Sequence, residues 1–397
     1  MKIKGLYLHN FRNYGLCSLQ FPAMVNIFYG KNAQGKTNLL EAIFYAAFGM
    51  SHRTFQEDDL FGDGRREMSV KADFTSFDFD YEIKIKRYEQ NGRIKKELLL
   101  DNVNIKAKEH YGTLNTVMFS PEDLQLIKGE PQLRRRFFDM QIAQTDKAYY
   151  ELLVKYNRLL QQRNRLLKEI RDNNGDKGQL NLWNNELSAS AARIIKKRLA
   201  ALEELLVIAS GIYASIAGGS ESMLINYALK TSNDFILQQS DKSESEWQEF
   251  YLKELHERQA LDILRGNTSI GPHRDDLFFY VNGKLLKAFG SQGQQRSAAL
   301  ALKLAQLEYV KNNTGEYPVL LLDDVMSELD SERRTHLLKF IDGRVQTFIT
   351  VNDKHLIPDL NNNAYFYIEN GKAVFENLFT EERFSSSDPV VCAAMQG

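Results

Sequence analysis

Residues 30–37 read G-K-N-A-Q-G-K-T and carry the residue types needed to hold a triphosphate. Gly30 and Gly35 allow backbone conformations that a β-carbon would block, so successive N–H groups can face phosphate oxygens. Lys36 can reach the terminal phosphates as a point charge, with a binding and a catalytic role, and Thr37 offers a hydroxyl to Mg²⁺. The predicted ligands are therefore a nucleoside triphosphate and Mg²⁺. The predicted nucleotide-binding residues here are Gly30, Lys31, Asn32, Ala33, Gln34, Gly35, Lys36 and Thr37.

A chance match to this short pattern is the alternative, and the flanking sequence decides against it. A short apolar run at 25–29 precedes the loop, and apolar residues with helical spacing follow from Leu39 to Ala47. A strand before and a helix after is the context that a phosphate loop needs, because the helix N-terminus adds a positive dipole.

A second group of polar residues follows the apolar run P-V-L-L-L at 318–322. Asp323 and Asp324 come directly after this predicted strand. A carboxylate at a strand end beside a phosphate loop can hold Mg²⁺, which we assign to Asp323. The next carboxylate can orient or deprotonate a water, so Asp324 is the predicted catalytic acid. Strand ends often carry acids, so this pair gains its meaning from the loop.

A third candidate is the run F-G-S-Q-G-Q-Q-R at 289–296, just before an apolar helical pattern. Ser291 can cap that helix, Gly293 allows close backbone approach, and the helix N-terminus suits an anion. We therefore predict that Ser291, Gly293 and Gln294 bind the nucleotide held by the loop of another copy. The alternative is an ordinary Gly-rich turn before a core helix. Past the two acids, Ser327 to Asp330 would lie at the same dimer seam, or Ser or Asp there simply caps a helix.

The pattern of predicted elements is that of an α/β protein with a helical insertion. Both ends of the chain mix strands and helices, whereas residues 121–264 are mainly helical. We expect a head made of residues 1–120 and 265–380, a helical lobe at 121–264, and a disordered tail at 381–397. Predicted strands cover residues 3–8, 25–29, 69–74, 80–86, 277–281, 319–322 and 347–350, and predicted helices cover 148–170, 180–216, 296–310 and 331–340.

Composition sets the class of molecule. The chain has 397 residues, 43% hydrophobic and 26% charged, with a formal net charge of −1. Any nucleic-acid surface must therefore be a local patch. Only two cysteines are present, which suggests a reducing compartment. The N-terminus lacks the apolar core of a signal peptide, and no stretch approaches about 18 uninterrupted apolar residues, so we expect no membrane span. We expect a soluble cytoplasmic protein.

A local excess of positive charge lies between residues 134 and 198, which contain 15 Lys or Arg and 7 Asp or Glu. Basic side chains along a helix pair would neutralise duplex phosphates without reading bases. The alternative is a solvated helix face. The residues singled out for DNA contact are Arg134, Arg135, Arg163, Arg165, Lys196 and Lys197.

The order of these motifs resembles the ABC-type ATPase heads of the SMC group and, within it, the RecF family of bacterial recombination mediators. The resemblance spans about residues 1 to 350. It rests on N-F-R-N-Y at 10–14, the phosphate loop, S-H-R-T at 51–54, F-S-P-E-D-L-Q-L-I-K-G at 119–129, R-R-R-F-F-D at 134–139, G-P-H-R-D-D-L at 271–277, G-S-Q-G-Q-Q-R at 290–296 and L-L-L-D-D-V-M-S-E-L-D at 320–330.

The resemblance implies an ABC-type head that dimerises on ATP and binds duplex DNA or single–double-strand junctions in recombinational repair, replication-fork maintenance and the SOS response. It also implies RecO and RecR as partners. Arg12 could touch nucleotide or DNA, since related heads place a basic residue there. An SMC-like or transporter-type ABC ATPase subunit is the alternative, although the former would need long heptad repeats and the latter a surface for membrane partners.

Three positions depart from the general pattern of such heads. Glu122 or Gln125 stands where related heads carry a metal-sensing glutamine. Asp324 is one methylene shorter than the usual Glu, and the residues after the predicted strand at 347–350, where many heads place a histidine, are Val351, Asn352 and Asp353. These differences suggest slow hydrolysis, so the expected enzyme is a weak Mg²⁺-dependent ATPase that works as a switch.

Overall fold

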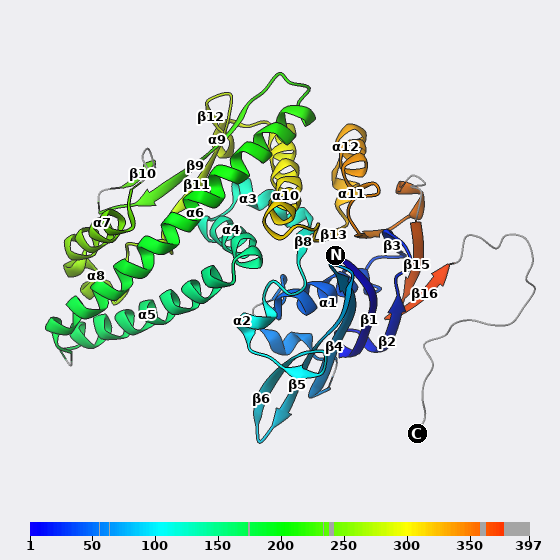
Figure 1. The fold of residues 1–397 in the computed structure, drawn as a ribbon, viewed down its shortest axis with the longest axis horizontal. Helices are drawn as coiled ribbons and strands as arrows, with labels where there is room; N and C mark the ends of the chain where they lie inside the picture. Colours follow the sequence, from blue (N-terminus) through cyan, green and yellow to red (C-terminus); the bar gives the residue numbers. More distant parts are fainter. Residues whose placement is uncertain are drawn as a thin grey trace, which may run out of the picture. The chain divides into compact units, whose positions relative to one another are not determined.

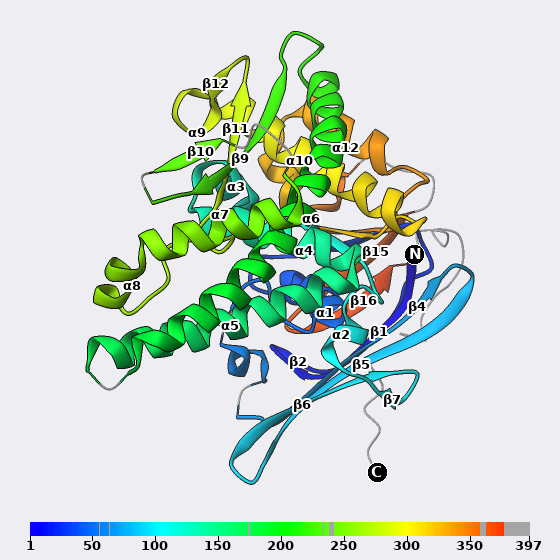
Figure 2. The ribbon, with the colours of Figure 1, turned by 60° about the vertical axis from the view of Figure 1, so that its left-hand side comes forward.

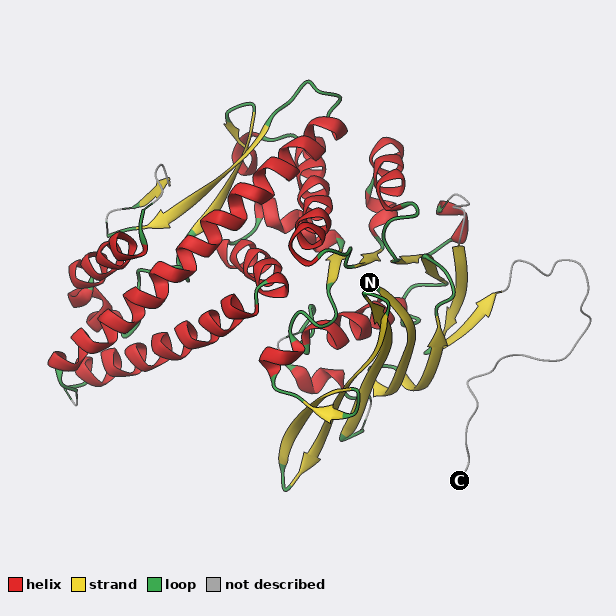
Figure 3. Ribbon diagram, viewed as in Figure 1, coloured by secondary structure: helices red, strands yellow, loops and turns green. Residues whose placement is uncertain are grey.

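The structure, a computed structural model, describes residues 1–54, 56–62, 64–173, 175–232, 234–237, 242–357 and 363–376. The chain forms two compact units, which we describe separately (Figure 1). The first combines residues 1–121 with residues from 306 onward, and the second comprises residues 122–305. Both units mix helices and strands, which confirms the predicted α/β class (Figure 3).

One sheet of the first unit is mainly parallel and has the order β16-β15-β3-β14-β13-β8. Its central strands are buried along their whole length, as expected for a parallel sheet covered on both faces. The strands are β3 (Val25–Tyr29), β8 (Thr116–Phe119), β13 (Val319–Asp323), β14 (Thr347–Val351), β15 (Asn363–Glu369) and β16 (Lys372–Glu376).

The other sheet of the first unit is antiparallel, with the order β2-β1-β4-β5-β6-β7. Alternating burial along β4 and β5 shows that one face packs inward and the other is more open to solvent. The predicted hairpin turn at Asn91-Gly92 joins β5 to β6. The strands are β1 (Lys2–Phe11), β2 (Tyr14–Gln20), β4 (Glu67–Ser76), β5 (Phe79–Gln90), β6 (Arg93–Leu100) and β7 (Val103–Asn104).

Helix α1 (Lys36–Phe48) contacts strands of both sheets in the first unit. It is apolar on nearly every side, as expected of a helix buried within a core, and it ends at Gly49 in a left-handed conformation. This burial anchors the segment that follows the phosphate loop. The remaining helices are η1 (Glu57–Leu60), α2 (Ala107–His110), α11 (Val325–Glu328), α12 (Ser331–Ile341) and η4 (Lys354–Leu356).

In the second unit, α5 (Lys147–Arg171) and α6 (Leu180–Ile216) form the predicted helical hairpin and lie side by side (Figure 2). The Asp146 side chain caps α5 by accepting a hydrogen bond from Tyr149 N. The other helices are η2 (Pro121–Leu124), α3 (Gln125–Lys128), α4 (Pro131–Thr145), η3 (Lys177–Gln179), α7 (Glu244–Glu257), α8 (Gln259–Arg265) and α9 (Leu286–Phe289).

The second unit also contains a four-stranded sheet, β10-β9-β11-β12, which the sequence pattern only partly indicated. Because β11 pairs along its length with β9, the segment after residue 265 stays with the second unit. The boundary lies between residues 305 and 306, later than the predicted 264/265. The strands are β9 (Met223–Lys230), β10 (Phe235–Leu237), β11 (Asp276–Val281) and β12 (Lys284–Leu285).

Helix α10 (Gln292–Thr314) begins in the second unit and ends in the first. It starts earlier than the predicted residue 296, because Ser291 and Gln294 form a reciprocal capping pair. Gln294 N donates to Ser291 Oγ at 3.1 Å, and Ser291 N donates to Gln294 Oε1 at 2.9 Å.

One helix of the described chain, at Lys177–Ile216, is long and apolar enough by composition to cross a membrane. The core helix of a soluble protein passes the same test. Its buried face includes Arg198, whose guanidinium forms two hydrogen bonds of 2.9 Å with the Asp139 carboxylate. We therefore interpret it as a packed helix of the second unit. The predicted tail at 381–397 lies outside the described residues.

Candidate nucleotide-binding site

The predicted phosphate loop and the predicted acids meet at one edge of the parallel sheet. Strands β3, β14 and β13 are neighbours and run in the same direction, so their carboxyl ends share that edge. The loop follows β3, Thr350 lies near the end of β14, and Asp323 ends β13. The order of the strands therefore brings together segments that lie far apart in the sequence.

Asp323 accepts two hydroxyl hydrogen bonds on the same carboxylate oxygen. Thr37 Oγ1 donates to Asp323 Oδ1 at 2.8 Å, and Thr350 Oγ1 donates to it at 2.7 Å. A hydroxyl next to a carboxylate is an oxygen donor set that suits Mg²⁺, which takes few protein ligands and completes its shell with phosphate and water. Among the described residues, no cluster of three or more His, Cys, Asp or Glu could hold a metal by itself.

Lys36 lies almost buried at the first turn of α1, and oxygens without formal charge surround its ammonium. Its Nζ donates to Gly30 O at 2.6 Å, to Lys31 O at 2.8 Å and to Asn352 Oδ1 at 3.0 Å. Burial lowers the pKa of Lys36, while the charges of the two nearby aspartates oppose that shift. The ammonium is therefore preorganised at the loop with hydrogen-bond partners that carry no compensating charge.

Asp324 adopts a left-handed conformation, with φ 52°, directly after β13. Its backbone N–H donates to Thr350 Oγ1 at 2.9 Å, and its carboxylate accepts a hydrogen bond of 2.9 Å from Ser327 Oγ. Thr350 thus ties the two acids together, since it donates to one and accepts from the other. The strained turn directs the two consecutive carboxylates differently.

The loop backbone has the positive φ values that its glycines allow. Gly30 has φ 143° and Gly35 φ 113°, and Ala33 also lies in the left-handed region with φ 63°. Lys31 and Asn32 are exposed. The loop is therefore folded as a concave turn before α1, as the phosphate-loop pattern predicts.

In the second unit, Ser291 is exposed at the start of α10 and caps it, as described above. Gln294 Nε2 also donates to Glu221 Oε1 at 2.7 Å. Gly293 is half-buried in the first turn of the same helix. The helix N-terminus that the sequence indicated therefore exists, and its contact with a nucleotide of another copy stays a prediction, as does metal sensing by Glu122 or Gln125.

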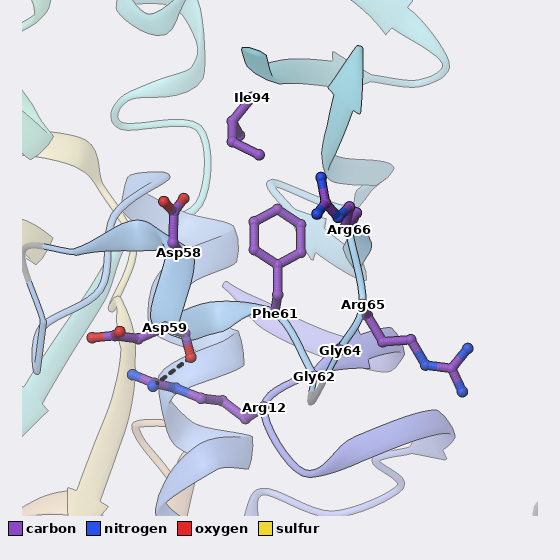
Figure 4. Close-up of a pocket in the computed structure, with 9 residues that line it drawn as sticks. All are labelled: Arg12, Asp58, Asp59, Phe61, Gly62, Gly64, Arg65, Arg66 and Ile94. Atoms are coloured by element: carbon purple, nitrogen blue, oxygen red, sulfur yellow. Dashed lines mark hydrogen bonds between the residues drawn. The ribbon is translucent and has the colours of Figure 1, made fainter. Parts of the chain in front are cut away.

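Arg12 has an internal partner in the first unit. Its Nε and NH2 donate to the two oxygens of the fully buried Glu41 carboxylate at 2.9 and 2.7 Å, and NH1 donates to Asp59 O at 2.7 Å. Its guanidinium also borders an open pocket of about 580 Å³. Figure 4 shows the lining residues Arg12, Asp58, Asp59, Phe61, Gly62, Gly64, Arg65, Arg66 and Ile94.

Two of the basic residues predicted to contact DNA are buried, so the structure contradicts that assignment. Arg134 forms hydrogen bonds of 2.7 and 2.9 Å with the two oxygens of Asp276. Arg163 is fully buried, and its NH1 donates to Asp262 Oδ2 at 2.9 Å. A guanidinium neutralised inside a core cannot reach duplex phosphates, and charge counting along the sequence does not reveal such partners.

The other basic residues differ in exposure. Arg165 and Lys196 are exposed, and Lys197 is half-buried and paired with Asp146. Arg135 is half-buried, and its NH1 donates to Asp275 O at 2.6 Å. Their contact with DNA stays a prediction, which Arg165 and Lys196 fit best.

The segment G-P-H-R-D-D-L has a structural role in the second unit. His273 Nδ1 lies 2.7 Å from Tyr156 Oη, and both Nε and NH2 of Arg274 donate to Thr268 O at 3.2 and 3.1 Å. Burial lowers the pKa of His273 to about 3. His273 and Arg274 therefore both have partners within the second unit.

Sequence reasoning missed three groups at the nucleotide edge. Thr350 and Asn352 contact Asp323 and Lys36, yet they had been noted only as a strand end and as the absence of a histidine. The turn between β15 and β16, at Asn370 and Gly371, contacts the loop as well. Its Asn-Gly dipeptide between two apolar runs is a hairpin signal that could have revealed it.

Comparisons with known proteins agree with this geometry. The family model described as the RecF/RecN/SMC N-terminal domain matches residues 2–373. The chain is 40% identical over 390 residues to the DNA replication and repair protein RecF of Natranaerobius thermophilus, covering 96% of this chain and 100% of that protein. The RecF of Bacillus subtilis is also 40% identical over 390 residues, with coverage of 94% and 100%.

Solved structures show the same fold. The recombination mediator protein RecF, solved as RecF-ATP, matches with a TM-score of 0.86 and 36% identity, covering 94% of this chain and 97% of its own. An Smc head bound to a domain of ScpA matches with a TM-score of 0.55 and 16% identity, which shows the fold alone. The chain therefore belongs to the RecF family of DNA replication and repair proteins, within the RecF/RecN/SMC group.

Proposed function

We propose that the protein is an ATP-dependent DNA-binding protein of recombinational DNA repair and replication-fork maintenance, in which ATP drives two copies together. The observation that carries the proposal is the 2.8 Å hydrogen bond from Thr37 Oγ1 to Asp323 Oδ1, beside the buried ammonium of Lys36. Relatives solved as RecF-ATP support the choice of ATP. The RecFOR pathway named for them supports RecO and RecR as partners. A role in the SOS response is proposed from the family resemblance alone.

Each group at this edge has a defined task in the proposed site. The N–H groups of the loop and the α1 N-terminus bind the phosphates, and Lys36 places a positive charge among them. Thr37 and Asp323 would hold Mg²⁺, which when bound neutralises charge on the phosphate oxygens. Asp324 orients a water for attack, as a carboxylate next to the metal ligand can do.

Hydrolysis is proposed to be slow, so that ATP works as a switch. Asp324 has a shorter side chain than the usual Glu, and Ser327 already donates to its carboxylate. Asn352 lies in the segment where many heads place a histidine. Its amide oxygen accepts a hydrogen bond from Lys36 and, unlike a histidine ring, the amide does not titrate. These features favour binding over turnover.

The second half of the site is proposed to come from another copy. Ser291, Gly293 and Gln294 present a capped helix N-terminus, which is an anion site, on the surface of the second unit. Two copies joined in this way would close around duplex or gapped DNA, with Arg165 and Lys196 among its contacts. We propose a cytoplasmic location, where such a substrate is found.

The test is sedimentation of the purified chain with and without ATP and Mg²⁺, and with and without duplex DNA. We expect a monomer alone, a dimer with ATP, and tighter DNA binding by the dimer. An unchanged sedimentation coefficient together with an unchanged DNA affinity in saturating ATP would contradict the proposed switch.

A surface variant tests the contribution of the second copy. Ser291→Arg places a bulky cation at the proposed seam, so ATP should still bind to a monomer that no longer dimerises. Ser243→Arg, at the exposed and similarly capped start of α7, is the matched control and should dimerise normally if Ser291 lies at the seam itself. Loss of ATP binding in Ser291→Arg would argue against the assignment.

A further inference from the structure

The last hairpin of the described chain contacts the phosphate loop from outside. Strand β15 pairs in parallel with β3, with Tyr367 opposite Tyr29, so the ends of both strands lie at the same edge. The turn at Asn370-Gly371 follows β15 just as the phosphate loop follows β3. Residues far apart in the sequence are therefore neighbours here.

Gln34 is the residue of the loop that the turn holds. Asn370 N donates to the side-chain Gln34 Oε1 at 2.7 Å, and Gly371 N donates to the backbone Gln34 O at 3.1 Å. Asn13 Nδ2 donates to the same backbone oxygen at 3.0 Å. Both acceptor groups of Gln34 are thus directed toward protein donors.

These contacts determine where the next N–H points. In a planar trans peptide, the carbonyl of one residue and the N–H of the next point in opposite directions. Because Gln34 O faces Gly371 and Asn13, the N–H of Gly35 points away from both of them. In the next peptide, Tyr14 Oη donates to Gly35 O at 3.1 Å. The orientation of phosphate-binding N–H groups is therefore set before any ligand binds.

Close backbone packing at two glycines leaves the turn and the loop little freedom to move. A β-carbon at Gly371 would lie 2.3 Å from Asn13 O, and one at Gly30 would lie 2.4 Å from Ile368 O. Both neighbours are backbone atoms, which cannot move aside as a flexible side chain can. Gly371 of the turn thus packs against the backbone of Asn13, and Gly30 of the loop packs against the backbone of β15.

Two other Asn-Gly hairpin turns show that this packing is not required by the turn itself. Gly92 and Gly283 have φ values of 71° and 75°, close to the 70° of Gly371. A β-carbon at Gly92 or Gly283 would meet nothing within 4 Å. The three turns share their backbone strain, and the crowding belongs to the one that contacts the loop.

We propose that the β15–β16 turn is a latch that presets the phosphate loop for a triphosphate, with Gln34 as its positioning residue. This inference rests on the proposed function, because the loop must bind ATP for its preset shape to matter. The latch acts through the orientation of the Gly35 N–H, and neither Gln34 nor Gly371 needs to touch the nucleotide.

The test compares Gly371→Ala with Gly92→Ala in the full chain, using a fluorescent ATP analogue for affinity and thermal unfolding without nucleotide for stability. Both variants add a β-carbon at the same strained φ, so both should lower the melting temperature. Gly371→Ala should also weaken binding of the analogue by about tenfold, because displaced N–H groups lose their alignment. Gly92→Ala should bind like the wild type.

A second variant keeps the test informative if Gly371→Ala does not fold. Gln34→Met preserves length but removes the side-chain acceptor, so it should weaken binding by about threefold, less than the loss in Gly371→Ala. The double variant should be no weaker than Gly371→Ala alone, since both changes break one contact.

The outcomes separate the two proposals. If the wild type fails to bind the analogue, both the proposed function and the latch proposal are wrong. If the wild type binds but Gln34→Met also binds like the wild type, or Gly371→Ala matches Gly92→Ala in affinity, the latch is wrong while the proposed function stands.

Discussion

Two regions of the molecule bury a cationic side chain, and they treat its charge differently. In the first unit, Lys36 donates to two backbone carbonyls and the amide oxygen of Asn352. In the second unit, the fully buried Arg163 donates to the Asp262 carboxylate, to Asn184 and to Thr268. In the first arrangement the hydrogen-bond partners are neutral, and only the more distant charges of Asp323 and Asp324 act on the ammonium. In the second, a directly hydrogen-bonded carboxylate balances the cation inside the core.

The difference separates ligand binding from structure. A buried cation among neutral oxygens is costly unless an anion arrives, and such sites are prepared for one. A buried cation paired with a carboxylate is satisfied, and removal of one partner exposes the full cost of the other. Arg134 and Arg198 resemble Arg163 in that an aspartate balances each of them. Both arginines form two hydrogen bonds with their aspartate.

The largest effect should come from breaking the internal pair. Arg163→Met leaves Asp262 buried without its cation and should lower the free energy of unfolding by about 3–5 kcal/mol. The matched control is Arg165→Met on the same helix, whose exposed pair with Glu169 is worth under about 0.5 kcal/mol. Denaturant unfolding measures both. If both variants lost a similar free energy of unfolding, the buried pair would not differ from the exposed pair in stability.

The next largest effect should come from removing the ammonium of Lys36. Lys36→Met removes a cation whose hydrogen-bond partners in the described part of the chain are neutral oxygens, so the protein should fold with little loss of stability. ATP binding should weaken by about 10- to 100-fold, the value of hydrogen bonds to a charged group, and ATP-dependent dimerisation should disappear. Titration calorimetry with ATP checks it, with the surface variant Lys155→Met as control. Retained affinity would mean that Lys36 only supports the loop.

A pH effect tests a second buried group of the second unit, His273. His273 is buried and its pKa falls from 6.5 to about 3, so the unfolded state binds a proton more readily. Stability from this group is therefore present above pH 6.5 and is lost as pH falls, by about 2 kcal/mol between pH 6.5 and about pH 5. The shift of Asp275, whose pKa rises to about 6, acts in the opposite direction.

The measurement is the pH dependence of unfolding in the wild type and in His273→Gln. The variant should lose the contribution of His273 and become more stable relative to the wild type as the solution is acidified. A constant difference between the two proteins from pH 7 to about pH 5 would show that His273 does not titrate differently in the folded state.

The smallest effect concerns the exposed basic residues. The variants Arg165→Gln and Lys196→Gln should each weaken binding to duplex DNA by a few fold and reduce its salt dependence by about one unit of slope. Fluorescence anisotropy across a salt series measures both. A variant that weakens binding without changing the slope would indicate that the residue does not neutralise a phosphate.

The sequence was a good guide to local elements and a weaker guide to charge. The strand at 25–29 and the helix at 180–216 have the predicted limits, because periodicity and turn residues act locally. The start of α10 was placed late, since the Ser291–Gln294 capping pair was only half recognised. Charge counting predicts that Arg134 and Arg163 contact DNA and does not reveal their burial, because their partners lie 142 and 99 residues away.

By itself, the sequence determined that a phosphate loop stands between a strand and a helix, and that two acids follow another strand. Those features depend on residues adjacent in the chain. Tertiary structure alone decided that Thr350 would join the acids, that Asn352 would meet Lys36, and that Gly371 would meet Gln34. Parallel strand order made these contacts, because it brings the carboxyl ends of distant segments to one edge of a sheet.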